Sequence, residues 1–216
     1  MLFRSQFGHF HRPTHTNTSW EAAKFEACNH RFVHLEEPGW GVAIVNDSTY
    51  GHDVTRTVRT DGDRGTTTTV RVSLLRAPRF PDPETDQGVH HFRHALVPGA
   101  GIGDAVREGW RINLPERVVP GAEEVAPLVT VDQDAVVVTA VKLADDGSGD
   151  VVVRFHEAHG GRARATLTAG FEVAGVTATD LLERPSAEAP SLRYEGNEVS
   201  LRLRPFELVT LRFTKA

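Results

Sequence analysis

Apolar residues alternate with polar ones along most of this chain, and no other feature constrains its fold as strongly. The alternation runs through seven segments rich in Val, Thr, Leu and Phe and bounded by Gly, Asp or Pro: 39–47, 66–78, 90–99, 135–144, 150–158, 162–171 and 199–215. Successive side chains of a β-strand point to opposite faces of the sheet, so a period of two is typical of strands with one buried face. Many short strands separated by frequent turns predict an all-β chain built as an antiparallel β-sandwich.

The last segment, 199–215, shows how the alternation assigns faces. Pro205 interrupts it and predicts a bulge or a break between two strands, because proline donates no hydrogen bond to a sheet. We expect these side chains to face the core: Leu201, Leu203, Leu208, Leu211 and Phe213. We expect these to face water: Arg202, Arg204 and Arg212.

Helix signals are confined to two stretches. In 19–32, Ser19 is placed to cap a helix, but the same residues also alternate as a strand would, so both structures stay open. In 99–113 we expect at least one helical turn from Asp104. Cys28, which falls in the first stretch, is expected to be a small buried residue.

A seam with three prolines divides the chain at 114–128. Regular strands stop before it and resume after it, which is typical of a boundary between domains. We expect one β unit at 6–122, as part of a large β-sandwich, and a small terminal β-sandwich at 126–216.

Composition excludes several classes of protein. The net charge of −5 gives no support for a nucleic-acid partner, and no stretch approaches the apolar length needed for a membrane span. The single cysteine excludes an internal disulfide and a cysteine zinc cluster. No signal peptide opens the chain, so a cytoplasmic location is expected.

Histidine is concentrated in two clusters. His9, His11 and His15 lie in the stretch "FGHFHRPTHTNTSWE", and His90, His91 and His94 lie in "GVHHFRH". Three imidazoles suit zinc, but neither cluster has the spacing of a helical zinc motif, and the sequence favours ordinary polar residues on a half-exposed strand or loop for both.

The proline-rich loop 78–88 holds three acids: Asp82, Glu84 and Asp86. Paired carboxylates catalyse glycoside hydrolysis or bind calcium. However, the prolines restrict the backbone and a glycine follows the last acid, which favours a rigid surface turn. A turn is likewise expected at Asn46 and Asp47. "GAGIGD" (99–104) lacks the spacing of a dinucleotide-binding motif and is interpreted as a loop.

Three long motifs resemble one enzyme family. "QFGHFHRPTHTNTSWEAAKFEACNHRFVHLEEPGWGVAIVNDSTYGHDV" (6–54) resembles the C-terminal half of α-mannosidases of glycoside hydrolase family 38. "VRVSLLRAPRFPDPETDQGVHHFRHALVP" (70–98) is similar to a second motif of that family. The segments "VVRFHEAHGGRARATL", "TDLLE" and "LRLRPFELVTLRF" are similar to its terminal β-sandwich.

This resemblance implies a large β-sandwich portion followed by a small one, taken from a retaining enzyme that removes terminal α-linked mannose from oligosaccharides. In that family, the zinc ion and the aspartate nucleophile belong to an N-terminal catalytic domain. We therefore assign no catalytic and no metal-binding residue here, expect no cofactor in this chain, and expect the fragment to be inactive without that domain as its partner. The abrupt start of the motifs at Gln6 agrees with a truncated enzyme.

The resemblance also implies a role for "HRPTHTNTSW". Loops of the large sandwich reach the mouth of the active site in the family, and Arg12, His15, Asn17 and Trp20 are the candidate substrate-binding residues. Sugars need both hydrogen-bonding groups and an apolar surface, which these residues offer. Packing against a neighbouring domain explains the same residues, and a carbohydrate-binding module or a structural, oligomer-forming sandwich remain as alternative functions.

Overall fold

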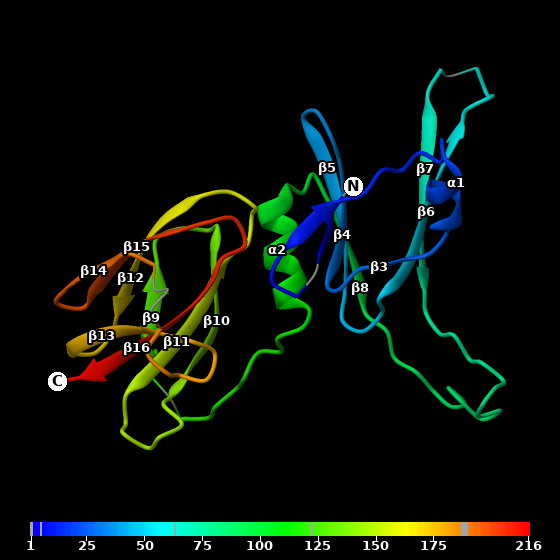
Figure 1. Cartoon of the computed structure of the whole chain (residues 1–216). Helices are drawn as coiled ribbons and strands as arrows, with labels where there is room; N and C mark the ends of the chain where they lie inside the picture. The colour runs from blue at the N-terminus through cyan, green and yellow to red at the C-terminus, as the bar shows by residue number, and fades with distance from the viewer. Residues whose placement is uncertain (1, 5, 63, 122, 187–189) are drawn as a thin grey trace. The chain divides into compact units, whose positions relative to one another are not determined.

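All strand pairs among the described residues are antiparallel, as the alternating sequence predicts. The computed structural model describes residues 2–4, 6–62, 64–121, 123–186 and 190–216. The described residues form sixteen strands and two short helices, and the chain divides into two compact units, Met1–Glu116 and Arg117–Ala216 (Figure 1). The all-β, sandwich-like fold class is therefore confirmed. Neither described helix is long and apolar enough to cross a membrane.

The first unit contains a five-stranded sheet and a three-stranded sheet. The larger has the order β2-β1-β4-β5-β8 and consists of β1 (Leu2–Arg4), β2 (His9–His11), β4 (Phe32–Glu37), β5 (Trp40–Asn46) and β8 (His94–Pro98). Helix α2 (Ile102–Arg111) packs on β4 and β5 and buries Ala105 and Val106 with Phe32 of the sheet. The smaller sheet has the order β3-β6-β7, with β3 (Ala27–Cys28), β6 (Gly51–Val58) and β7 (Thr66–Ser73), and helix α1 (Ser19–Ala23) precedes β3.

The second unit is a β-sandwich of two four-stranded sheets. One sheet has the order β10-β11-β16-β13, with β10 (Val136–Leu143), β11 (Val151–Glu157), β13 (Val173–Thr179) and β16 (Leu208–Lys215). The other has the order β14-β15-β12-β9, with β9 (Val129–Val131), β12 (Ala163–Ala169), β14 (Leu192–Glu195) and β15 (Glu198–Leu203). Their inner faces share one core, whose fully buried members include Val153, Phe155, Leu167, Leu211 and Phe213. Each such side chain stabilises the fold by about 1.5–3 kcal/mol through the removal of apolar surface from water.

The segment 199–215 divides at Pro205 as predicted, but one assigned face is wrong. β15 ends at Leu203 and β16 begins at Leu208. Val209, Leu211 and Phe213 face the core, whereas Leu208 lies on the opposite face and is half-buried. The connection 204–207 contains a residue in the left-handed region, Phe206, with φ of 57°. Leu208 is out of step with Leu211 and Phe213 by one residue, so the alternation within β16 itself places it on the opposite face.

The ambiguous stretch 19–32 contains both a helix and a strand. α1 has five residues, and its N-cap is Thr18, which corrects the expected cap at Ser19. The helix ends after one turn, and the chain extends into β3. α2 begins at Ile102, two residues before the expected start, because the Asp104 carboxylate accepts the amide hydrogen of Gly101 (2.9 Å) and caps the first turn.

Two further predictions are wrong. Cys28 is exposed, because β3 pairs only two residues with the start of β6 at the edge of the small sheet. The strand expected at 90–99 begins only at His94, so His90 and Phe92 lie outside the sheet and stack on each other instead, with ring centroids 6.0 Å apart.

Candidate functional site

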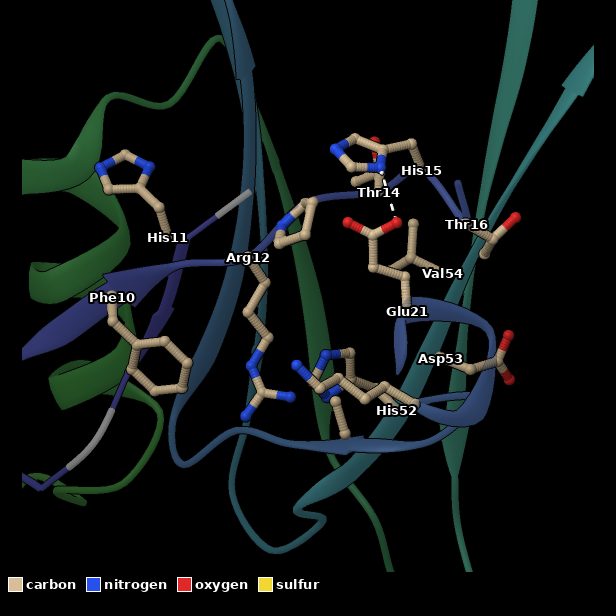
Figure 2. A pocket seen from close by; sticks show the side chains of 13 residues that line it. Phe10, His11, Arg12, Thr14, His15, Thr16, Glu21, His52, Asp53 and Val54 are labelled. Carbon is tan, nitrogen blue, oxygen red and sulfur yellow. Dashed lines mark ion pairs between the residues drawn. The ribbon is translucent and has the colours of Figure 1, made fainter. Parts of the chain in front are cut away.

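The loop between β2 and α1 forms one wall of a cavity in the first unit. The cavity has a volume of about 340 Å³ and is lined by residues 10–16, by Glu21 of α1 and by residues 52–54 of β6, together with Lys24 and Ala27. Figure 2 shows Arg12, Glu21 and His52 in the space between the loop and β6, whereas the Asp53 side chain points away from it. A volume in this range is typical of sites for small molecules.

A capping box holds the loop in place at its C-terminal end. The Thr18 hydroxyl accepts the amide hydrogen of Glu21 (3.2 Å), and the Glu21 carboxylate accepts the amide hydrogen of Thr18 (2.9 Å). This reciprocal pattern satisfies two amides at the start of a helix that would otherwise have no partner. The short helix therefore fixes where Glu21 enters the cavity.

Glu21 also anchors one of the predicted binding residues. Its Oε2 lies 3.1 Å from Nδ1 of His15, as the dashed line in Figure 2 marks. Desolvation raises the pKa of Glu21, but the Thr18 amide and His15 together outweigh it, so that pKa lies below its ordinary value. The carboxylate stays ionised at neutral pH and orients the His15 imidazole towards the cavity.

Arg12 lies between an aromatic ring and a buried histidine. Its guanidinium carbon is 4.7 Å from the centre of the Phe10 ring, and Nη2 lies 3.9 Å from the Cys28 sulfur. Burial, together with the positive charge of Arg12, lowers the pKa of His52 to about 4. His52 is thus neutral at physiological pH, and Arg12 is the cation at this end of the cavity (Figure 2).

The structure brings together two of the four predicted binding residues. Arg12 and His15 both line the cavity, whereas Asn17 and Trp20 lie farther along the loop and on α1 and do not. Trp20 is 79% exposed, and Asn17 is exposed as well. Glu21 and His52 also line the cavity, but neither is among the residues predicted from the sequence. The capping-box pattern of Thr18 and Glu21 was a visible signal for the first, but only the pairing of β6 with β3 brings in the second.

The histidine clusters do not form a metal site among the described residues. In those parts of the chain, no three side chains of His, Cys, Asp or Glu converge as metal ligands would. The His15 imidazole is engaged by Glu21, His94 Nε2 lies 2.9 Å from the Thr49 hydroxyl, and His90 Nε2 lies 3.0 Å from the Asp86 carbonyl oxygen.

The acidic loop 78–88 is a turn built from its own side chains. Asp82 accepts the amide hydrogen of Glu84 (2.9 Å), and Asp86 accepts that of Ala77 (3.0 Å). Asp86 and Gly88 both have positive φ, which fits the predicted turn. Because two of the three carboxylates are used in this way, the geometry favours the turn over paired catalytic acids.

Asn46 and Asp47 also form the turn expected of them. Asn46 is buried, and its side-chain oxygen accepts the amide hydrogens of Ser48 (3.2 Å) and Thr49 (3.0 Å). Asp47 binds the Arg93 guanidinium (2.8 Å), and this interaction lowers the pKa of Asp47 to about 2. This pair joins the turn after β5 to the residue that precedes β8.

Two models of one protein family match the chain. They are described as "Glycosyl hydrolases family 38 C-terminal domain", which matches residues 2–84, and "Glycosyl hydrolases family 38 C-terminal beta sandwich domain", which matches residues 135–211. Together they account for more than half of the residues. The two matches fall in the two compact units, one in each.

Several proteins similar in sequence to this chain are named as α-mannosidases. "Alpha-mannosidase 2C1" of Homo sapiens is 36% identical over 97% of this chain, and "Alpha-mannosidase G" of Dictyostelium discoideum is 30% identical over 98% of it. The chain spans only 20% and 19% of the length of these curated relatives. A solved structure, an α-mannosidase from Enterococcus faecalis V583, aligns with a TM-score of 0.66 at 20% identity, covering 99% of this chain and 24% of that one. At that identity the likeness concerns the fold.

Proposed function

Because the chain belongs to glycoside hydrolase family 38 and represents part of its C-terminal region, we propose that it is a section of an α-mannosidase that removes terminal α-linked mannose from oligosaccharides. The relatives that suggest this activity are much longer than this chain. Its partner in the intact protein is then an N-terminal catalytic domain. A cytoplasmic location agrees with the single cysteine, which leaves no internal disulfide.

The cavity beside residues 10–16 is the observation that supports a part for this chain in sugar binding. Arg12 supplies hydrogen-bond donors, the ionised Glu21 supplies an acceptor beside His15, and the Phe10 ring supplies an apolar surface. A pyranose presents a rim of hydroxyl groups and weakly apolar faces, so it is complementary to such a mixture. Arg12 and His15 contact the hydroxyl groups of the substrate in this proposal.

Asn17 and Trp20 take a different part in the same proposal. They lie next to the cavity in sequence but outside its lining, and both are exposed. They contact sugar units farther from the cavity, with the Trp20 indole stacked on a pyranose face. Binding of a longer oligosaccharide therefore depends on these two residues, whereas binding of a simple mannoside does not.

The zinc ion implied by the family does not fit the residues described here. A catalytic zinc needs about three converging protein ligands, and no such group exists among those residues. We assign the metal and the nucleophile to the catalytic domain of the parent enzyme. The chain by itself is then inactive, and its residues act only on the binding of the substrate.

A mannosidase assay tests this proposal. A chromogenic α-mannoside is incubated, with zinc present, with the 216-residue chain and with a protein extended upstream through the catalytic domain. Only the extended protein is expected to release the chromophore. In the extended protein, Arg12→Ala is expected to lower kcat/KM by about a hundredfold, as the loss of a charged hydrogen bond to the substrate does, and mainly through KM.

The matched control for Arg12→Ala is Arg76→Ala, an exposed arginine of the same unit that lies away from the cavity. It is expected to leave the kinetics unchanged. Activity of the 216-residue chain alone would refute the assignment of the chemistry to another domain. Mannose binding by this chain, without activity in the extended protein, would identify a carbohydrate-binding module instead.

A further inference from the structure

The outer face of the sheet β14-β15-β12-β9 carries exposed charges in two groups of opposite sign. The first group consists of three arginines, Arg164, Arg193 and Arg202, and the second of two acids, Glu195 and Glu198. All five side chains alternate with the residues that line the core of the second unit, so they point away from it. The sheet lies within that unit, and its strands are labelled in Figure 1.

Like charges stand directly opposite each other in this sheet. Arg164 of β12 pairs with Arg202 of β15, and Glu195 of β14 pairs with Glu198 of β15. Directly opposed like charges destabilise an antiparallel pair. Charged residues on an edge strand protect a sheet against pairing with another chain. This does not explain the arginine pair, because β12 and β15 are the two central strands of this sheet. The arginine pair therefore has no explanation within the isolated sheet.

Within the described parts of the chain, none of the five side chains has a partner that would offset this repulsion. Across the described residues, no hydrogen bond or ion pair involves any of the five. Asp132 lies close to the arginines, but its carboxylate accepts the amide hydrogen of Thr166 (2.8 Å). The charges are consequently available to a partner.

The charged groups are arranged symmetrically about Ser200 on β15. Glu198 lies two residues to one side of Ser200, and Arg202 lies two residues to the other, so each is about 7 Å from it along the strand. The middle row consists of Arg193, Ser200 and Thr166, with Thr166 Oγ1 3.4 Å from Ser200 Oγ. A shallow depression of about 620 Å³ opens over the arginine end of the face.

We propose that this face binds a second copy of the chain, related by a two-fold axis that crosses the strands at Ser200. The axis lies between the two facing sheets, and rotation about it places Glu198 of each copy against Arg202 of the other. Arg193 lies in the row of the axis, so the Arg193 side chains of the two copies face each other, each flanked by Glu195 of both copies. An interface with two-fold symmetry must be self-complementary, and this face carries both halves of the complement at equal distances from its centre.

Charge also decides between a second copy and other partners. A uniformly acidic partner would match the arginines but would repel Glu195 and Glu198, and a uniformly basic partner would do the reverse. A second copy sets the row of Arg164 and Arg202 in each chain against the row of Glu195 and Glu198 in the other. The inference concerns the second unit alone and does not depend on the sugar-binding proposal for the first.

The association is expected to be weak and dependent on salt. A face of four short strands buries less area than a standard stable interface, which is typical of transient complexes. Its exposed charges act over about 8 Å at physiological ionic strength and over about 3 Å in 1 M salt. Dimerisation is therefore strongest at low ionic strength and is lost as salt is added.

Two charge-reversal variants test the proposal by sedimentation velocity of the 216-residue chain at low salt. One variant, Arg164→Glu with Arg202→Glu, makes the face acidic, and the other, Glu195→Arg with Glu198→Arg, makes it basic. Each variant alone is expected to dimerise at least about tenfold more weakly than the unchanged chain. An equal mixture is expected to form a heterodimer, because the acidic face then meets the basic face.

The matched control carries Arg76→Glu and Arg79→Glu, which change the net charge as the acidic variant does but lie on an exposed loop of the first unit. It is expected to dimerise like the unchanged chain. Circular dichroism verifies that each variant is folded, and Glu198→Gln, which removes a single charge, provides a milder second test. A monomeric unchanged chain at low salt would overturn the proposal, as would a dimer unaffected by both reversals or a mixture that fails to associate.

Discussion

Glu157 allows a prediction whose magnitude follows directly from its contacts. Its side chain is 1% exposed, and its two carboxylate oxygens accept three amide hydrogens, from His159 (2.8 Å), Gly160 (2.9 Å) and Phe206 (2.9 Å). One carboxylate thereby holds the turn after β11 and the connection between β15 and β16. The Phe206 backbone has a φ of 57°, a conformation that a non-glycine residue adopts only when its surroundings enforce it.

Glu157→Gln keeps the shape of the side chain and removes its charge. The single amide oxygen of glutamine accepts at most two of the three hydrogens, and its NH2 group then faces the third, which is a donor as well. A buried donor without an acceptor costs about 1–3 kcal/mol, and the two retained hydrogen bonds lose their charge assistance. We expect a loss of about 3 kcal/mol in the free energy of unfolding of the second unit. Glu157→Ala leaves all three amides without a partner and is expected to cost more.

Urea unfolding followed by two signals measures this effect. All three tryptophans, Trp20, Trp40 and Trp110, lie in the first unit, so their fluorescence reports on that unit, whereas circular dichroism reports on both. For an m-value of about 1.5 kcal/mol/M, the loss lowers the midpoint of the second unit by roughly 2 M. The tryptophan transition is expected to stay in place.

Glu172→Gln is the control, because Glu172 is an exposed glutamate of the same unit. Its effect is expected to stay within about 0.5 kcal/mol. A Glu157→Gln variant as stable as this control would refute the reasoning. So would a Glu157→Ala variant that is no less stable than Glu157→Gln, because the cost is attributed to the number of amides left without an acceptor.

Three further predictions concern the first unit and are measured by tryptophan fluorescence or hydrogen exchange. The pKa of His52 is about 4 in the folded protein and 6.5 in the unfolded chain, so its contribution of about 3 kcal/mol to the free energy of unfolding is complete above pH 6.5 and is lost as pH falls towards 4. His52→Gln should flatten the dependence of stability on pH. An unchanged slope of stability against pH would contradict this prediction. Gly41→Ala places a Cβ against the Ala100 carbonyl oxygen and is expected to cost about 3 kcal/mol, whereas a neutral effect would show that this contact relaxes freely. Thr18→Ala removes the cap of α1 and is expected to cost about 1 kcal/mol, seen as faster amide exchange in that helix; exchange at the original rate would disprove the role of the cap.

Some features of this chain follow from local chemistry alone. The alternation of apolar residues located eight of the sixteen described strands, because a strand with one buried face has a period of two wherever it occurs. Pro205 located the break between the last two strands, and the acids and prolines of 78–88 indicated a turn, since both effects act within a few residues. The long motifs in 6–54 and 70–98 indicated the family, which the two family matches support.

Other features depend on contacts between residues far apart in the chain. Cys28 was expected to be buried because cysteine usually is, but its position at a sheet edge is set by the pairing of β3 with β6. The cavity unites Arg12 with His52, which are forty residues apart, and nothing in the local sequence around His52 signals that it belongs there.

The sequence by itself determined the type of secondary structure, the family and the loop that carries Arg12 and His15, because these depend on nearby residues. Only the tertiary structure decided which side chains meet. It separated Asn17 and Trp20 from the cavity and added Glu21 and His52 to it. It also placed Arg164 opposite Arg202 and Glu195 opposite Glu198. The physical reason is that strand register is set by the burial of the opposite, apolar face, and the charges on the outer face follow wherever that register places them.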